Sequence, residues 1–191
     1  LEQIQSIAGV ARKYNLLLHL DGARLWNASI ATGIKEAVYA SMFDTVSVCF
    51  SKGLGAPVGS LLAGSVSAIE KARFYRKQQG GAMRQVGILA EAARYALEHN
   101  RDRLVEDHKN CQILAKGLAG LSGIEVDAEG PETNMLFINT GDHAANDLAN
   151  RLEGLGVRLL QTGPNTLRAV TNLTVSRQEI SDVLSAFEEL V

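Results

Sequence analysis

Hydrophobic residues recur at two different periods along the chain, and the change of period separates predicted helices from predicted strands. Residues 1–14 place apolar side chains three or four positions apart and carry two basic residues in the last turn, which is typical of an amphipathic helix. Residues 16–20, 45–50 and 58–64 are short apolar or β-branched runs, typical of buried strands. Helical stretches between such strands indicate an α/β layered sheet.

Helical periodicity dominates the middle of the chain, in three predicted helices over residues 68–78, 83–99 and 103–118. After Gly123 the pattern changes, with short strand candidates at 124–127, 135–138, 157–160 and 167–170 and helices at 144–154 and 176–190. Ser176 and Glu179 have the spacing of a capping box. We expect residues 1–100 to form part of a large α/β domain. Residues 101–191 are expected to form a connecting helix and a small α+β domain.

The composition of the 191 residues (20.5 kDa) is that of an ordinary globular protein, with 46% hydrophobic and 21% charged residues. Nineteen basic and 21 acidic residues give a net charge of −2, which offers no positive surface for nucleic acid or an anionic membrane. No apolar run is long enough to span a bilayer, and no signal peptide is recognised. The first residues predict the middle of a helix and lack Met, so we expect part of a longer chain.

The two cysteines, Cys49 and Cys111, have neither zinc-type spacing nor the pattern of a disulfide framework. We expect two buried thiols in a reducing compartment, and therefore a cytoplasmic protein. No metal site is predicted. Among the histidines, His19 is expected to be a core imidazole within a buried strand, whereas His99, His108 and His143 are expected to be solvated.

Lys52 is the residue whose position says most about chemistry. It follows a predicted buried strand and precedes a glycine-rich turn, residues 53–59. A lysine there lies at the edge of a sheet where α/β proteins bind ligands, and the glycines allow a flat ligand close to the backbone. Taken alone, it could equally be a surface lysine in a turn.

Asp21 also closes a predicted strand, directly before a glycine. Alone, it is best explained as a helix N-cap. However, Asp21 and Lys52 are 31 residues apart, a separation that suits adjacent parallel strands. An acid and a lysine at neighbouring strand ends together point to pyridoxal 5'-phosphate (PLP), which needs a Schiff-base lysine and an acidic partner for its pyridinium nitrogen.

Three segments resemble the low-specificity threonine aldolases. Residues 18–28 (LHLDGARLWNA) are similar to the family's aspartate motif, residues 47–60 (SVCFSKGLGAPVGS) to its PLP-lysine motif, and residues 73–90 to the segment that follows. The resemblance covers essentially all 191 residues, as the C-terminal part of the family chain. It implies the aspartate-aminotransferase-like fold type I of PLP enzymes, as a homodimer or homotetramer. It also implies a β-hydroxy-α-amino acid substrate, with L-threonine or L-allo-threonine cleaved to glycine and acetaldehyde.

The same resemblance implies a role for five residues. Lys52 would be the Schiff-base lysine, Asp21 the partner of the pyridine nitrogen, and Arg24 a neighbour of the ring near its 3-oxygen. Arg84 would either reach a cofactor phosphate, including that of a neighbouring subunit, or be a plain arginine at a helix N-terminus. Arg168 would bind the substrate carboxylate, for which its planar fork is suited; without the resemblance it would be an exposed arginine at a strand end.

The chain also departs from the family pattern. Asn172 stands after Thr171 where family members often have a histidine, and the family's phosphate loop and ring-stacking histidine have no counterpart here. Three alternatives therefore stay open. One is another fold type I PLP enzyme, either a β-eliminating lyase or an aminotransferase. Another is an inactive truncated chain with a structural or interaction role. The last is a nucleotide-binding α/β domain, which ranks lowest because Gly53-Leu54-Gly55 lacks the third glycine of the dinucleotide fingerprint.

Overall fold

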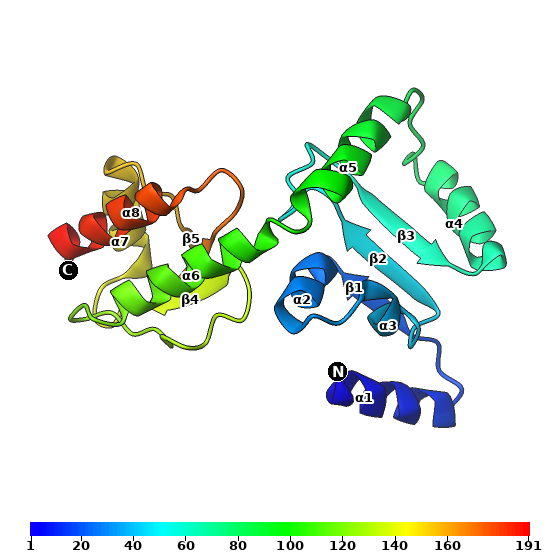
Figure 1. Ribbon diagram of the computed structural model, residues 1–191, viewed down its shortest axis with the longest axis horizontal. Helices are drawn as coiled ribbons and strands as arrows, with labels where there is room; N and C mark the ends of the chain where they lie inside the picture. Colours follow the sequence, from blue (N-terminus) through cyan, green and yellow to red (C-terminus); the bar gives the residue numbers. More distant parts are fainter. The chain divides into compact units, whose positions relative to one another are not determined.

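The computed structural model describes residues 1–191, which divide into two compact units, Leu1–Asp102 and Arg103–Val191 (Figure 1). Each unit contains its own three-stranded sheet. None of the helices combines the length and the hydropathy that a bilayer-spanning segment requires. The first unit comprises α1 (Glu2–Lys13), β1 (His19–Gly22), α2 (Leu25–Thr32), α3 (Glu36–Ala40), β2 (Thr45–Cys49), β3 (Ser60–Gly64), α4 (Val66–Gln78) and α5 (Gly87–Asn100).

The sheet of the first unit has the order β1-β2-β3. β1 and β2 are parallel, and β3 runs antiparallel to β2. Val46 and Val48 point from β2 into a core that also contains Leu25 of α2 and Tyr39 of α3. Both helices therefore pack on one face of the sheet, which leaves the other face free to carry polar side chains.

The beginning of this sheet differs from the sequence prediction. Residues 16–20 were expected to form a strand buried on both faces, but β1 starts at His19, and Leu17 is 84% exposed. Asn15 adopts a left-handed φ of 53° and turns the chain, and the Leu18 N–H is taken by the Asp44 side chain. An apolar run alone does not show which faces of a strand are covered. The predicted first residue of this strand and its predicted burial were therefore both wrong.

The second unit contains α6 (Leu104–Leu118), β4 (Met135–Asn139), α7 (Ala145–Gly154), β5 (Leu160–Gly163), β6 (Thr166–Val170) and α8 (Arg177–Leu190). Its sheet has the order β4-β6-β5 and is antiparallel throughout. The predicted strand at 124–127 is reduced to a single bridge between Glu125 and Asn139. The predicted capping box is confirmed, because Ser176 and Glu179 each accept the other's backbone N–H.

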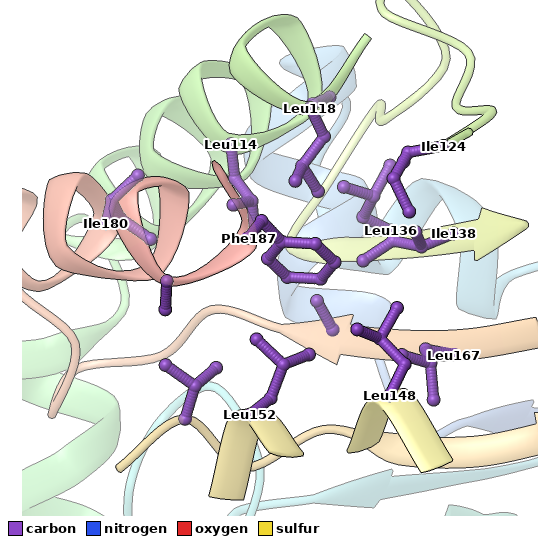
Figure 2. Packing of buried hydrophobic residues seen from close by; sticks show 14 of the residues in the cluster. Leu114, Leu118, Ile124, Leu136, Ile138, Leu148, Leu152, Leu167, Ile180 and Phe187 are labelled. Carbon is purple, nitrogen blue, oxygen red and sulfur yellow. The ribbon is translucent and has the colours of Figure 1, made fainter. Parts of the chain in front are cut away.

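Alternate residues of β4 and β6 form the core of the second unit with the three helices. Phe187 of α8 is fully buried at its centre, as Figure 2 shows. Around it lie side chains from α6, α7, β4 and β6, among them Leu114, Leu118, Leu136, Ile138, Leu148, Leu152 and Leu167. The opposite face of the sheet is open, since Phe137 and Leu160 are each more than half exposed.

Candidate functional site

The two residues on which the cofactor prediction rests lie near the ends of neighbouring parallel strands, Asp21 within β1 and Lys52 in the turn after β2. Asp21 is the third residue of β1 and pairs in register with Ser47 of β2. Lys52 follows the last residue of β2, Cys49, by three positions. Because parallel strands end at the same edge of a sheet, the acid and the lysine belong to one edge. Both side chains are exposed there.

Asp21 does not cap the following helix. Its Oδ1 accepts the Ala23 N–H at 3.1 Å, which closes a local turn at the end of β1. The N-cap position of α2 is Arg24, and no side-chain hydrogen bond caps that helix. The alternative explanation of Asp21 as an N-cap is therefore wrong, and its carboxylate is instead presented at the strand end.

A histidine lies on the same open face of the sheet as Asp21. His19 Nδ1 is 2.9 Å from Thr45 Oγ1, and its Nε2 is 3.4 Å from Ser47 Oγ. Each of the two hydroxyl groups can donate or accept a hydrogen bond, so together they can pair with both ring nitrogens in either imidazole tautomer. His19 is exposed, and the prediction that it is a buried core residue was wrong.

The turn that carries Lys52 is closed by backbone hydrogen bonds. The Phe50 N–H donates to the Gly59 carbonyl at 3.0 Å, the Ala56 N–H to the Phe50 carbonyl at 3.0 Å, and the Gly55 N–H to the Lys52 carbonyl at 2.9 Å. Gly55 has a φ of 71°, which a glycine adopts without strain. The backbone of the turn is thus fixed, while the lysine side chain extends into solvent.

The two other arginines of the first unit occupy separate places. Arg24 follows the last residue of β1 by two positions and is half-buried. Arg84 is exposed in the loop between α4 and α5, and no hydrogen bond or ion pair joins it to Asp21 or Lys52. A groove of about 570 Å³ lies near this loop, with apolar side chains of β3, α4 and α5 along its walls. Neither Asp21 nor Lys52 lines this groove.

Arg168 lies in the second unit, on the central strand β6. Its cross-strand neighbours are Phe137 of β4 and Leu160 of β5, on the open face of the sheet. The Nε of Arg168 is buried but has no hydrogen-bond partner. A buried donor without an acceptor is costly, and a carboxylate is the acceptor whose geometry matches the guanidinium edge.

A buried polar cluster in the second unit was missed at the level of sequence. Thr171 donates its hydroxyl to the backbone carbonyl of Asp107 at 2.6 Å, and its own carbonyl accepts the Asn134 side-chain amide at 2.7 Å. All three residues are buried. His108 is buried as well, so the prediction that it is solvated was wrong.

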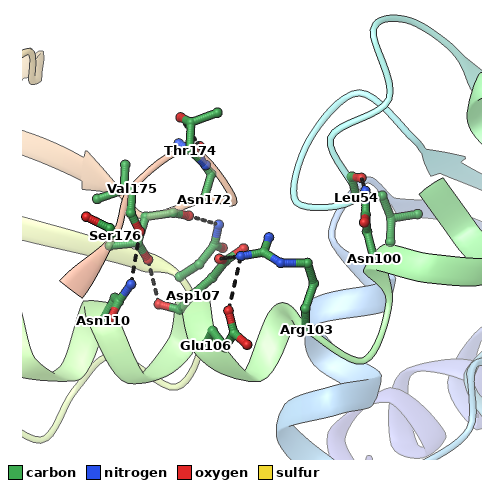
Figure 3. Close-up of polar contacts among 12 residues, drawn as sticks. Leu54, Asn100, Arg103, Glu106, Asp107, Asn110, Asn172, Thr174, Val175 and Ser176 are labelled. Atoms are coloured by element: carbon green, nitrogen blue, oxygen red, sulfur yellow. Dashed lines mark hydrogen bonds and ion pairs between the residues drawn. The ribbon is translucent and has the colours of Figure 1, made fainter. Parts of the chain in front are cut away.

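Asp107 is the charged member of this cluster. Neither carboxylate oxygen accepts a hydrogen bond, although Arg103 Nη2 lies 3.5 Å from Oδ1 (Figure 3). Burial raises the pKa of Asp107 to about 6, against the opposing effect of the Arg103 charge. The signal in the sequence was its position on α6, between Leu104 and Cys111 on the apolar stripe of the helix.

Comparison with solved structures shows which fold the chain adopts. Leishmania major threonine aldolase superposes with a TM-score of 0.79, at 23% sequence identity, over 99% of this chain and 56% of that chain. The predicted α/β architecture of fold type I is thereby confirmed.

The family follows from sequence comparison. Residues 1–141 match the model of the beta-eliminating lyase family, and the chain belongs to that family. It is 41% identical over 191 residues to low-specificity L-threonine aldolase 1 of Arabidopsis thaliana, covering 98% of this chain and 53% of that protein. It is 43% identical over 172 residues to the low specificity L-threonine aldolase of Escherichia coli K12, covering 90% of this chain and 50% of that protein. The chain thus spans about half the length of these relatives.

Proposed function

We propose that the protein is a PLP-dependent aldehyde-lyase that cleaves L-threonine or L-allo-threonine to glycine and acetaldehyde. The observation that carries the proposal is the parallel pairing of β1 with β2, which brings Asp21 and Lys52 to one edge of a sheet. The relatives named as threonine aldolases support the substrate class.

The residues at this edge fit PLP. Asp21, as a carboxylate, would hold a proton on the pyridine nitrogen through a charge-assisted hydrogen bond. Lys52, exposed on a turn of fixed backbone, would supply the amine that anchors the cofactor covalently. Arg24 follows β1 and would lie beside the ring, while Arg84 would reach a phosphate. When bound, the cofactor supplies an electron sink for cleavage of the bond between Cα and Cβ of the amino acid.

Arg168 is proposed to bind the carboxylate of the amino-acid substrate. The planar guanidinium, including its unpartnered Nε, can donate hydrogen bonds to both carboxylate oxygens at once. This arrangement fixes the orientation of the carboxylate as well as its position. The Nε of Arg168 is buried, and a charge-assisted hydrogen bond at a buried group is stronger than one in water. Orientation matters because the bond that breaks must align with the electron sink.

We further propose a homodimer or homotetramer in the cytoplasm. Two free cysteines, one of them fully buried, suit a reducing compartment. Gel filtration with light scattering would give the number of subunits, and an exclusively monomeric species would contradict the assembly.

The experiment is to incubate the full-length protein with PLP and L-threonine and to measure the products. Glycine and acetaldehyde in equal amounts are expected, and Lys52→Ala should abolish both turnover and the absorbance of lysine-bound cofactor. Lys109→Ala is the matched control, because Lys109 is an exposed lysine of α6. Acetaldehyde and glycine from the Lys52→Ala variant at the wild-type rate would refute the assignment of the lysine.

A second candidate is a β-eliminating lyase, which the family model favours by its description. It predicts a keto acid with ammonia, for example pyruvate from serine. An aminotransferase would instead give a keto acid only when an acceptor keto acid is present. If wild-type protein binds no PLP at all, a structural or interaction role replaces all three.

A further inference from the structure

We propose that Asn100 is a positioning residue for Lys52, because its side-chain amide fixes the turn that presents the lysine. This inference rests on the PLP site proposed above. Asn100 is the last residue of α5, and its Nδ2 donates to the Leu54 carbonyl at 2.7 Å (Figure 3). Leu54 lies two residues beyond Lys52, whereas Asn100 is 46 residues away from Leu54 in sequence.

The Leu54 carbonyl needs this donor. Leu54 has no exposed surface, so water cannot reach its backbone. The three hydrogen bonds that close the turn use the carbonyls of Phe50, Lys52 and Gly59, and none of them uses the carbonyl of Leu54. Buried backbone carbonyls are nearly always paired, and here the pairing comes from the side chain of Asn100.

The donor is itself held in place. The next residue, Arg101, donates from Nε to Glu36 Oε1 at 2.9 Å and from Nη2 to Ser29 Oγ at 3.3 Å. These bonds fasten the end of α5 to α3 and α2, which pack on the sheet that carries Asp21. Asn100 therefore connects the lysine turn to the same part of the first unit that positions the acid.

The consequence concerns Lys52 more than overall stability. No hydrogen bond holds the exposed Lys52 side chain, so the place of its amine depends on the backbone of the turn. Without the Asn100 amide, the turn would fluctuate around an unpaired buried carbonyl, and the amine would spend less time within reach of a ligand aldehyde. The bond of the lysine to the cofactor should weaken even where the protein stays folded.

The test uses the full-length protein with PLP at concentrations below saturation, followed by borohydride reduction. Peptide mass spectrometry then measures the fraction of Lys52 that carries the reduced cofactor. Asn100→Asp removes the donor at constant size, and we expect the apparent affinity for covalent attachment to fall on the order of tenfold. Asn100→His keeps a ring N–H near the same position and should restore most of it. Asn146→Asp, the same change at an exposed position of α7, is the control.

Hydrogen exchange without PLP gives a second readout. Exchange in residues 50–59 should be faster in Asn100→Asp than in wild type, and unchanged in Asn146→Asp. If circular dichroism shows that Asn100→Asp is unfolded, Asn100→Ala is measured in its place, with the same expectation.

The outcomes separate the two proposals. If wild-type Lys52 is not labelled, the PLP site fails and this inference fails with it. If wild-type Lys52 is labelled but the Asn100 variants are labelled with the same affinity, only the role of Asn100 is overturned. A lower melting temperature with unchanged labelling well below it would likewise show that Asn100 is merely structural.

Discussion

The buried carboxyl of Asp107 should make the stability of the second unit depend on pH. Its side chain has no exposed surface and accepts no hydrogen bond, and Arg103 is only within ion-pair distance at 3.5 Å. Burial is the main reason why its pKa rises from 3.8 to about 6, while Arg103 opposes the rise and Glu106 adds to it. Ionised Asp107 therefore destabilises the folded unit, and protonated Asp107 does not.

The sign follows from proton linkage. Between pH 4 and 6 the folded state binds more protons at Asp107 than the unfolded state, so its contribution to stability is fully present below pH 4. That contribution is lost as the pH rises through 6. A pKa difference of about two units corresponds to about 3 kcal/mol. Asp107→Asn, which cannot ionise, should remove this loss and should stabilise the second unit at pH 7.5 by about 1 to 3 kcal/mol.

Hydrogen exchange of α6 and β6 peptides at pH 5.0, 6.0 and 7.5, corrected for the intrinsic rates, gives the free energy of opening of the second unit. The fluorescence of Trp26, the only tryptophan, gives the urea unfolding of the first unit and should not change. The difference between wild type and Asp107→Asn isolates this carboxyl from other titrating groups. A variant that is destabilised equally at pH 5.0 and 7.5 would refute the reasoning.

Three further predictions concern packing and the thiols. Gly22→Ala would place a Cβ 2.6 Å from the Ser47 carbonyl oxygen, so we expect a loss of about 2 kcal/mol in urea unfolding followed by Trp26 fluorescence. Gly9→Ala in α1 meets no atom within 4 Å and should cause no loss. Phe187→Ala removes the side chain at the centre of the core of the second unit. Hydrogen exchange of α8 peptides should show that the free energy of opening falls by about 3 to 5 kcal/mol. A fall below about 1 kcal/mol would contradict the packing. Burial raises the pKa of Cys111 to about 11, so its thiol should react with a disulfide reagent only after unfolding. Half-buried Cys49 should react in the native protein. Modification of Cys111 in the native protein would contradict its burial.

Periodicity predicted the long elements because each has one covered face. The helices α1, α4, α5, α6, α7 and α8 and the strands β2, β4 and β6 begin and end within a few residues of the predicted bounds, whereas the short helices α2 and α3 were not predicted. The short helix α2 was not predicted, because it buries Asn27 and Ser29 together with Leu25, so hydropathy carries no helical pattern there. His19 was predicted to be buried and is exposed, and His108 was predicted to be solvated and is buried. The reason is related, since hydropathy does not show which face of an element the rest of the chain covers.

The parallel pairing of β1 and β2 was predictable, because it depends on chain connectivity. A strand, a helical crossover and a second strand place two strand ends at one edge, so the spacing of Asp21 and Lys52 was sufficient. The residues that support such a site were not predictable, because their partners are distant in sequence. Arg101 and Glu36, which are 65 residues apart, illustrate this.

Asparagines show the same limit most clearly. The side-chain amides of Asn100, Asn110 and Asn134 donate to the carbonyls of Leu54, Val175 and Thr171, which lie 46, 65 and 37 residues away. In the sequence each is an ordinary polar residue, yet each satisfies a carbonyl in irregular backbone, which has no partner in a helix or a sheet. Replacing any of the three by aspartate should destabilise its own unit. Only Asn100 reaches the Lys52 turn, so only its replacement should also weaken the attachment of PLP, and that contrast separates positioning from stability.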